Sequence, residues 1–226
     1  MKLEELKELI ESGAIEASVE NYIESGNLIK SNNDEVPYLI HCGWDPVLAH
    51  RCNREWAESN IELFEDIENQ IDDDNERKKV LESIIYQDSH WDYVLKSIHF
   101  KSNSYDWFFL ISDSKIQGVC ITFHPKDSLL DKNEIFYIEY VSVAPWNRKN
   151  LFCDRVFKSV GTKLVKCAQS YAVATHKLSY GFSLHSLPQA NGYYEHLGMK
   201  AIVGHEKGPM NYYEMPKEKA ELMVVC

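Results

Sequence analysis

The sequence has no run of 18 or more apolar residues, so we expect no transmembrane helix. It also lacks an excess of positive charge, since 24 lysines and arginines stand against 35 acidic residues, for a formal net charge of −11. A general nucleic-acid binder needs a basic face, which this charge argues against. The N-terminal stretch MKLEELKELIESG lacks the apolar centre of a signal peptide. We therefore expect a cytoplasmic protein with no nucleic-acid or membrane partner.

The six cysteines include no CxxC pair, which predicts reduced thiols rather than a disulfide framework. One cluster in HCGWDPVLAHRC is dense: His41, Cys42, His50 and Cys52. Its spacing matches no zinc finger or zinc ribbon. We therefore interpret the cluster as chance and expect no metal site.

Length and patterning predict two regions. The chain has 226 residues, of which 44% are hydrophobic, enough to bury the core of one domain. Up to about residue 100 the patterns are mostly helical, and from Tyr105 onward they are rich in strands. We expect a mostly helical region at 1–100 that packs on or extends a core at 101–226. The fold class expected is α/β (α+β), with a mixed, mostly antiparallel sheet flanked by helices.

The N-terminal region contains three helical patterns. The first spaces its leucines as a helix does and should stop at Gly13. The second opens with Asp45 as an N-cap and Pro46 at the first helical position. The third, DDDNERKKVLESIIYQ, begins with acids that suit the helix dipole. VPYLI at 36–40 indicates a short strand.

The C-terminal region alternates strands with helices. WFFLISDSKIQGVCITFHP predicts a hairpin around an Asp-Ser-Lys turn, and EIFYIEYVSVAP predicts a long strand that Pro145 stops. A helix follows, with an apolar face of Val160, Leu164, Cys167, Ala168 and Tyr171. After the strand KLSYGFSLHS, a short helix should have Ser186 and Gln189 as a capping box and Gly198 as its stop. KAIVGHE and MNYYEM indicate closing strands.

Two of these stretches, in this order, resemble the GNAT superfamily of N-acetyltransferases. IEYVSVAPWNR is similar to the family's fourth strand and the start of its pyrophosphate loop. ANGYYEHLGM is similar to the ending A-x-x-[FY]-Y-x-x-x-G-[FM]. The resemblance covers roughly the C-terminal half of the chain. It implies acetyl-CoA as donor and transfer of the acetyl group to a primary amine, of a small molecule or a protein, by direct attack in a ternary complex.

The stretch from strand to helix at 142–168 has no GxGxxG and no GxxxxGK[ST], yet its order of strand, basic turn and helix suits an anion. By the resemblance, Ser159 and Gly161 form an S-x-G version of the family's G-x-G, and Arg148 follows the proline. About eight more residues separate Arg148 from Gly161 than R-x-x-G-x-G allows. Either the loop is enlarged, or Arg155 and Lys158 replace the missing arginine. The alternative is an ordinary helix with one tolerated glycine.

The coenzyme A ligands that follow from this resemblance are Val141, Ser142, Val143, Arg148, Lys158, Ser159, Val160, Gly161 and Thr162. The backbone N–H groups at 141–143 are the expected oxyanion donors, because the resemblance implies that this strand splays from the next one. A β-bulge beside the proline would instead leave the same groups to water.

Acetyl transfer also needs a base for the amine and an acid for the departing thiolate. The resemblance makes Tyr194 the general acid, with Tyr193 in the packing position before it; alternatively both rings belong to the core. Glu139 is the candidate base, because it alternates with buried positions of its strand and can face a cleft. It could equally be a solvated strand residue. His185 is the competing base, since imidazole titrates in the useful range, or else a capping or packing residue.

Two further questions stay open in the sequence. The altered loop leaves a catalytically inactive GNAT-like binding module as the alternative function, and an acyl-CoA transferase with a longer acyl group as a third. The acidic clusters FEDIENQIDDDNE and SNNDEV favour a cationic acceptor, or simply form a solvated face. A homodimer is neither indicated nor excluded.

Overall fold

The computed structural model describes residues 3–18, 21–85 and 88–225. The chain forms two compact units: unit 1 contains Met1–Lys101, Phe109–Val119 and Ser142–Gly161, and unit 2 contains Ser102–Phe108, Cys120–Val141 and Thr162–Cys226. The division therefore does not follow residue 100, because three long strands contribute to both units.

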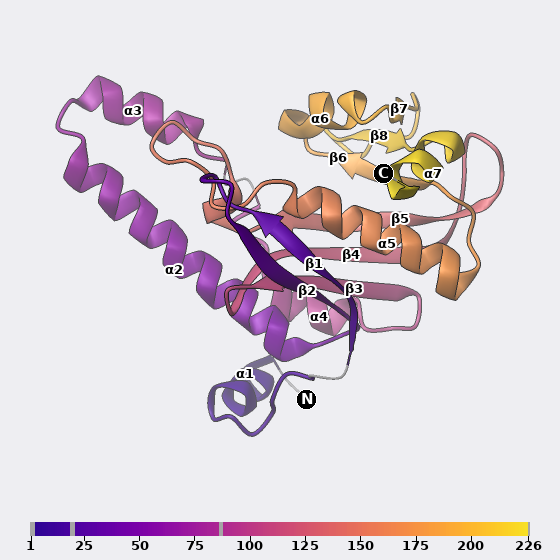
Figure 1. The fold of residues 1–226 in the computed structure, drawn as a ribbon, viewed down its shortest axis with the longest axis horizontal. Coiled ribbons are helices and arrows are strands. Elements are labelled where there is room, and N and C mark those ends of the chain that lie inside the picture. The colour runs from indigo at the N-terminus through magenta and orange to yellow at the C-terminus, as the bar shows by residue number, and fades with distance from the viewer. Residues whose placement is uncertain (1–2, 19–20, 86–87, 226) are drawn as a thin grey trace. The chain divides into compact units, whose positions relative to one another are not determined.

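The elements are labelled in Figure 1. In chain order they are α1 (Leu3–Glu11), β1 (Tyr22–Ile29), β2 (Glu35–Cys42), α2 (Pro46–Gln70), α3 (Asp74–Ser83), α4 (Tyr93–His99), β3 (Tyr105–Ser112), β4 (Lys115–Asp127), β5 (Glu134–Val143), η1 (Pro145–Asn147), α5 (Val160–His176), β6 (Phe182–Ser186), η2 (Pro188–Ala190), α6 (Asn191–His196), β7 (Lys200–Ala201), β8 (Asn211–Glu214) and α7 (Lys217–Val225). The strand order is β1-β2-β3-β4-β5-β6-β8-β7, with β5 and β6 parallel. The expected mixed α/β class is confirmed. None of the described helices is long and apolar enough to cross a membrane.

The helices of unit 1 begin and end where local signals place them. The Asp45 carboxylate accepts hydrogen bonds from the backbone N–H groups of Val47 and Leu48, at 2.9 and 3.0 Å, and so caps α2. Gly13, at φ +72°, donates its N–H to the carbonyl of Ile10 just after α1 ends. Both predicted boundaries are confirmed.

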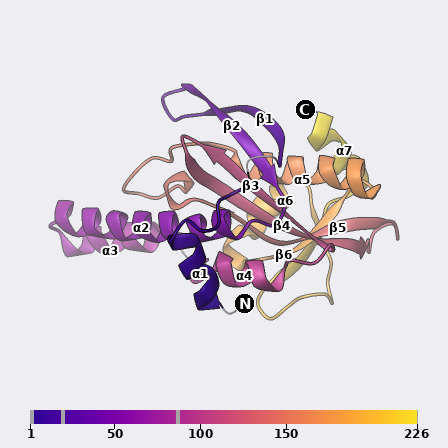
Figure 2. The same ribbon diagram turned by 90° about the horizontal axis from the view of Figure 1, so that it is seen from below.

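The helices α2 and α3 lie side by side, as Figure 2 shows from below. A small core of Ile67, Val80 and Ile84 forms where they meet. A second small core joins α1 to α4. Most acidic side chains on α2 and α3 are exposed, so the acidic cluster that spans them is a solvated face.

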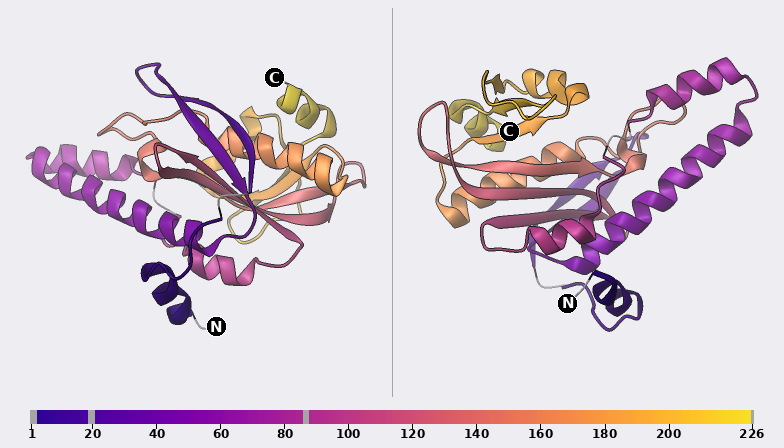
Figure 3. Two further views of the ribbon diagram at one scale, coloured as in Figure 1. Left: turned by 60° about the horizontal axis from the view of Figure 1, so that its bottom comes forward. Right: turned by 180° about the vertical axis from the view of Figure 1, so that it is seen from behind.

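Unit 1 also contains a hairpin, which makes it less helical than expected. The strands β1 and β2 pair antiparallel from Tyr22↔His41 to Ile29↔Glu35 and form the long twisted ribbon of Figure 3. The strand expected at 36–40 is confirmed within β2, but β1 was not foreseen. Of its residues only Leu28 is buried, so β1 carries little apolar periodicity of its own and depends on pairing with β2.

The turn between β3 and β4 is confirmed as a tight one. Asp113 and Ser114 have φ of 50° and 57°, so two left-handed residues connect the strands as in a type I′ hairpin. Aspartate tolerates this conformation better than most residues, which is why the short polar sequence could predict it.

In unit 2, β5 and β6 pair parallel only at Phe136↔Phe182, Tyr137↔Ser183 and Ile138↔Leu184, although β5 continues to Val143. The strand β6 also pairs with β8, antiparallel to it, and this pairing continues to the end of β6. The two central strands therefore part after Ile138, the divergence that the GNAT resemblance implies.

The rest of unit 2 agrees in part with expectation. The expected apolar face of α5 is largely confirmed, with Leu164, Cys167 and Ala168 buried. The capping box is wrong: the Ser186 hydroxyl donates to the neighbouring Leu187 carbonyl instead, and α6 has no side-chain cap. The helix α6 does stop before Gly198, at φ +85°, as expected. The helix α7 was not foreseen.

Candidate functional site

A pocket of about 400 Å³ in unit 2 contains two of the three candidate catalytic residues. Strands β4, β5, β6 and β8 and the segment 205–207 form its walls. Its lining residues are Phe123, Lys126, Tyr137, Glu139, His185, His205, Glu206, Lys207 and Tyr212. Glu139 and His185, expected as competing bases from separate strands, are thus brought together.

The hydrogen bonds of His185 fix which of its nitrogens carries the proton in the neutral ring. Its Nε2 lies 2.8 Å from the carbonyl oxygen of His205, and its Nδ1 lies 2.6 Å from the Tyr137 hydroxyl. A carbonyl oxygen only accepts, so Nε2 carries the proton and Nδ1 accepts from Tyr137. Burial lowers the pKa of His185, and the charge of Lys207 lowers it further, which outweighs the raising effect of the His205 carbonyl. The imidazole is therefore neutral and both its nitrogens are engaged.

Glu139 is one of the two carboxylates that line this pocket. It is the first residue of β5 beyond the last β5–β6 pair. Burial raises the pKa of Tyr137, and the nearby Glu139 carboxylate raises it further, so that phenol stays protonated. The other lining carboxylate, of Glu206, accepts hydrogen bonds from the Gly204 N–H at 3.0 and 3.1 Å. Glu139 is half-buried on β5 whereas Glu206 is exposed, so Glu139 is the lining carboxylate that the pocket encloses more.

Tyr194 lies on α6, half-buried against other rings. Its ring centroid is 5.3 Å from that of Tyr193 and 6.1 Å from that of Tyr213. Burial raises the pKa of Tyr194, which keeps its hydroxyl protonated and able to donate. Tyr193 does not take the packing position expected for it: it is 47% exposed, and its hydroxyl lies 3.1 Å from Oγ1 of Thr162 in the first turn of α5.

The basic turn in unit 1 holds Arg148 in an internal network. Its guanidinium lies 2.6 and 2.9 Å from the two carboxylate oxygens of Asp88. It also donates to the carbonyls of Val143, at 2.8 and 3.0 Å, and Ile85, at 2.9 Å, and to the Ser142 hydroxyl at 3.0 Å. The Ser142 hydroxyl in turn donates to Asp88. A phosphate at this turn would have to compete with all of these acceptors.

The segment between Arg148 and α5 is a loop that contacts the rest of unit 1. Its Phe157 is 2% exposed and forms an isolated antiparallel β-bridge with Lys30 of the hairpin. The N–H of Phe157 donates to the Asn147 side chain. The loop ends at Ser159, which has φ +62°. A Cβ added at Gly161 would meet only Val143, at 3.6 Å, so the helix start is uncrowded there.

The remaining predicted ligands lie on the same elements. Lys158 and Ser159 are exposed, Val160 is buried, Val141 and Val143 are half-buried on β5, and Ser142 is buried. Within unit 1, Ser142, Val143 and Arg148 are in direct contact. The pocket residues Tyr137, Lys126 and Lys207 were not predicted. Tyr137 could have been, because it lies two residues before Glu139 on the same face of β5.

No protein-family model and no curated protein matches the sequence. Similar solved structures include a putative acetyltransferase of the GNAT family from Desulfovibrio desulfuricans, with 13% identity, TM-score 0.46 and coverage of 79% of this chain and 98% of that one. An acyl-CoA N-acyltransferase from Pseudomonas aeruginosa has 12% identity, TM-score 0.41 and coverage of 64% and 92%. The N-acetyltransferase PseH from Campylobacter jejuni, in complex with acetyl coenzyme A, has 16% identity, TM-score 0.37 and coverage of 54% and 74%.

Proposed function

We propose that this protein is an acetyl-CoA-dependent N-acetyltransferase that acetylates a primary amine by direct attack in a ternary complex. The observation that carries the proposal is the unit 2 pocket, where β5 parts from β6 and which Glu139 and a neutral His185 both line. Divergence of two parallel strands exposes backbone donors next to a carboxylate, and acyl transfer to an amine uses both.

The roles follow from the protonation states. The Glu139 carboxylate takes the proton of the ammonium group, directly or through water. His185 positions its neighbours and does not itself take the proton of the amine, because its two nitrogens are bonded to the Tyr137 hydroxyl and the His205 carbonyl. Tyr194, kept protonated by burial, supplies a proton to the leaving thiolate.

The start of α5 fits a pyrophosphate better than the basic turn does. α5 is 17 residues long. The backbone N–H groups of its first turn, at Val160, Gly161 and Thr162, point out of the helix end as in any α-helix, where the dipole favours an anion. Lys158 is exposed just before it. Acetyl-CoA would supply the activated acyl group, with this helix start and Lys158 holding its phosphates. Arg148, paired with Asp88, would support the loop instead of contacting the ligand.

The charged residues that line the pocket favour a different acceptor from the cationic one that the acidic clusters of the sequence favoured. Lys126 and Lys207 line the pocket together with Glu139, whereas the acidic clusters of the sequence lie in unit 1. We infer an acceptor that carries an acidic group as well as its amine. The ammonium groups of the two lysines can bind the acidic group, while Glu139 takes the proton of the amine. Amines of each kind belong in the assay.

The test is isothermal titration of the full chain with acetyl-CoA, followed by free-thiol release with a panel of amines. We expect saturable binding, and turnover with an amino acid-like acceptor above that with a polyamine. Gly161→Glu places bulk and negative charge at the helix start, so it should abolish binding while the chain stays folded, as judged by circular dichroism. Normal acetyl-CoA binding by folded Gly161→Glu would move the phosphate site elsewhere.

The internal network of Arg148 favours one alternative, an inactive binding module of the same fold. This alternative predicts no heat of binding with acetyl-CoA and no thiol release with any amine. Binding without thiol release would instead retain the cofactor site and remove the amine assignment.

A further inference from the structure

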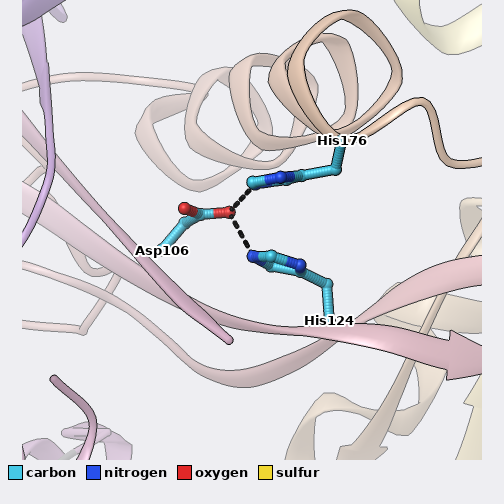
Figure 4. Close-up of side chains that lie close together, drawn as sticks. All are labelled: Asp106, His124 and His176. Atoms are coloured by element: carbon cyan, nitrogen blue, oxygen red, sulfur yellow. Dashed lines mark hydrogen bonds and ion pairs between the residues drawn. The ribbon is translucent and has the colours of Figure 1, made fainter. Parts of the chain in front are cut away.

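Three side chains of unit 2, outside the pocket, converge on one point (Figure 4). Asp106 lies on β3, His124 on β4 and His176 at the end of α5. Oδ2 of Asp106 lies 2.8 Å from Nε2 of His176 and 3.2 Å from Nε2 of His124. One carboxylate oxygen and two imidazole nitrogens therefore point at the same small volume.

A hydrogen-bonded ion pair accounts for only part of this arrangement. His124 is 8% exposed, and its Nε2 is buried. Among the described residues, this Nε2 has no partner with the geometry of a hydrogen bond. A buried imidazole nitrogen without a partner costs free energy, and a ligand at that nitrogen would remove the cost. The two imidazole rings are stacked, with centroids 3.7 Å apart and planes at 24°, and both Nε2 atoms face the Asp106 carboxylate (Figure 4).

The distances suit a small divalent ion. Zinc binds imidazole nitrogen and carboxylate oxygen at about 2.0–2.2 Å with tetrahedral angles, so that neighbouring ligand atoms lie about 3.3 Å apart. The separations from Asp106 are 2.8 and 3.2 Å, and all three ligand atoms lie within 4.8 Å of one another. To bind one ion, the rings of His124 and His176 would have to turn out of their stack so that both Nε2 lone pairs meet at it.

We propose that Asp106, His124 and His176 bind a divalent transition-metal ion, for which zinc suits the donor set best. Two histidines and one carboxylate provide three ligands, and solvent provides the fourth. Solvent has access because the side chains of Asp106 and His176 are 15% and 23% exposed. Such an ion would link β3, β4 and the end of α5, three segments of unit 2 that are distant in sequence. It would also reverse the expectation of no metal site.

The cluster is supported from both sides. The ring of Tyr171 contacts His176 edge-on, with centroids 5.4 Å apart, and Phe108 contacts Tyr171 in turn. The backbone N–H of His124 donates to the Ser104 carbonyl at 2.9 Å. Contacts of this kind limit how far the side chains that carry the ligand atoms can move.

The test is a titration of the chelator-treated full chain with Zn²⁺ in competition with a chromophoric chelator. We expect one tight site, and an affinity reduced by about tenfold or more in His176→Gln and in Asp106→Asn. The matched control is His99→Gln, an exposed histidine of unit 1 that should leave the affinity unchanged. Co²⁺ should give the intense visible absorption of a tetrahedral site in the native chain and lose it in His176→Gln.

Folding is controlled by thermal melts with and without Zn²⁺. A rise in melting temperature with Zn²⁺ in the native chain and in His99→Gln, but not in a folded His176→Gln, supports the site. If the native chain binds no Zn²⁺, or if His176→Gln binds it as tightly as His99→Gln, the three residues form only an ion pair with stacked rings and the proposal is wrong.

Discussion

The basic turn of unit 1 and the pocket of unit 2 use their charged residues in opposite ways. At the turn, Arg148 is 13% exposed at its side chain and donates to a carboxylate, a hydroxyl and two carbonyls of its own chain. In the pocket, Lys126, Lys207 and Glu139 surround a space of about 400 Å³. An arginine after a strand and a proline is therefore no evidence of an anion site until its partners are known. Here the partner, Asp88, lies 60 residues earlier in the chain.

The largest effect should follow from breaking the network at the turn. Arg148→Ala leaves the Asp88 carboxylate, 12% exposed at its side chain, without its cation. Removal of one partner from a buried pair costs about 3–5 kcal/mol, so we expect a loss of this size in the free energy of unfolding, measured with urea. Lys149→Ala, at the exposed neighbouring position, should cost almost nothing. A loss as small for Arg148→Ala would mean that its donors are available to a ligand after all.

Tyr194→Phe should have the next largest effect, on turnover rather than on stability. It removes the proposed proton donor and keeps the ring packed near Tyr213. We expect kcat to fall about a hundredfold, with the Kd for acetyl-CoA near the native value. Tyr193→Phe, which loses only a contact of its hydroxyl with Thr162, is the control and should keep most of the activity. Equal turnover of both variants would exclude Tyr194 as the acid.

The two candidate bases of the pocket can be separated by paired variants. Glu139→Gln removes the carboxylate, whereas His185→Gln removes an imidazole whose nitrogens are already engaged. We expect kcat/KM to fall about tenfold further in Glu139→Gln than in His185→Gln, a difference of about 1.4 kcal/mol in transition-state stabilisation. The reverse pattern would make His185 the base.

Features that depend on neighbouring residues could be predicted from the sequence, and features that depend on distant partners could not. The cap at Asp45, the stop at Gly13 and the Asp-Ser turn each rest on the chemistry of a few consecutive residues. The strand β1 was missed because pairing with β2, not its own periodicity, stabilises it. For the same reason the sequence placed Glu139 and His185 on separate strands but could not show that they share a pocket.

Metal and ion-pair clusters are the extreme case of this limit. Asp106, His124 and His176 have no spacing that resembles a metal motif, because three different elements bring them together. The histidines and cysteines at 41–52 are close along the chain, but they match no metal motif by spacing and form no metal-ligand group among the described residues. Closeness along the chain was therefore a poor guide to closeness in space.

The smallest expected effect concerns Gly161 and sharpens the contrast between the turn and the start of α5. A Cβ there would meet only Val143, at the ordinary contact distance of 3.6 Å, and the backbone at this position is not left-handed. Gly161→Ala should therefore raise the free energy of unfolding by about 0.4–1 kcal/mol, because alanine restricts the unfolded chain. If the start of α5 holds the pyrophosphate, the same methyl group should weaken acetyl-CoA binding severalfold in isothermal titration. A variant that gains stability and binds acetyl-CoA as the native chain does would show that this glycine serves the helix and not a ligand.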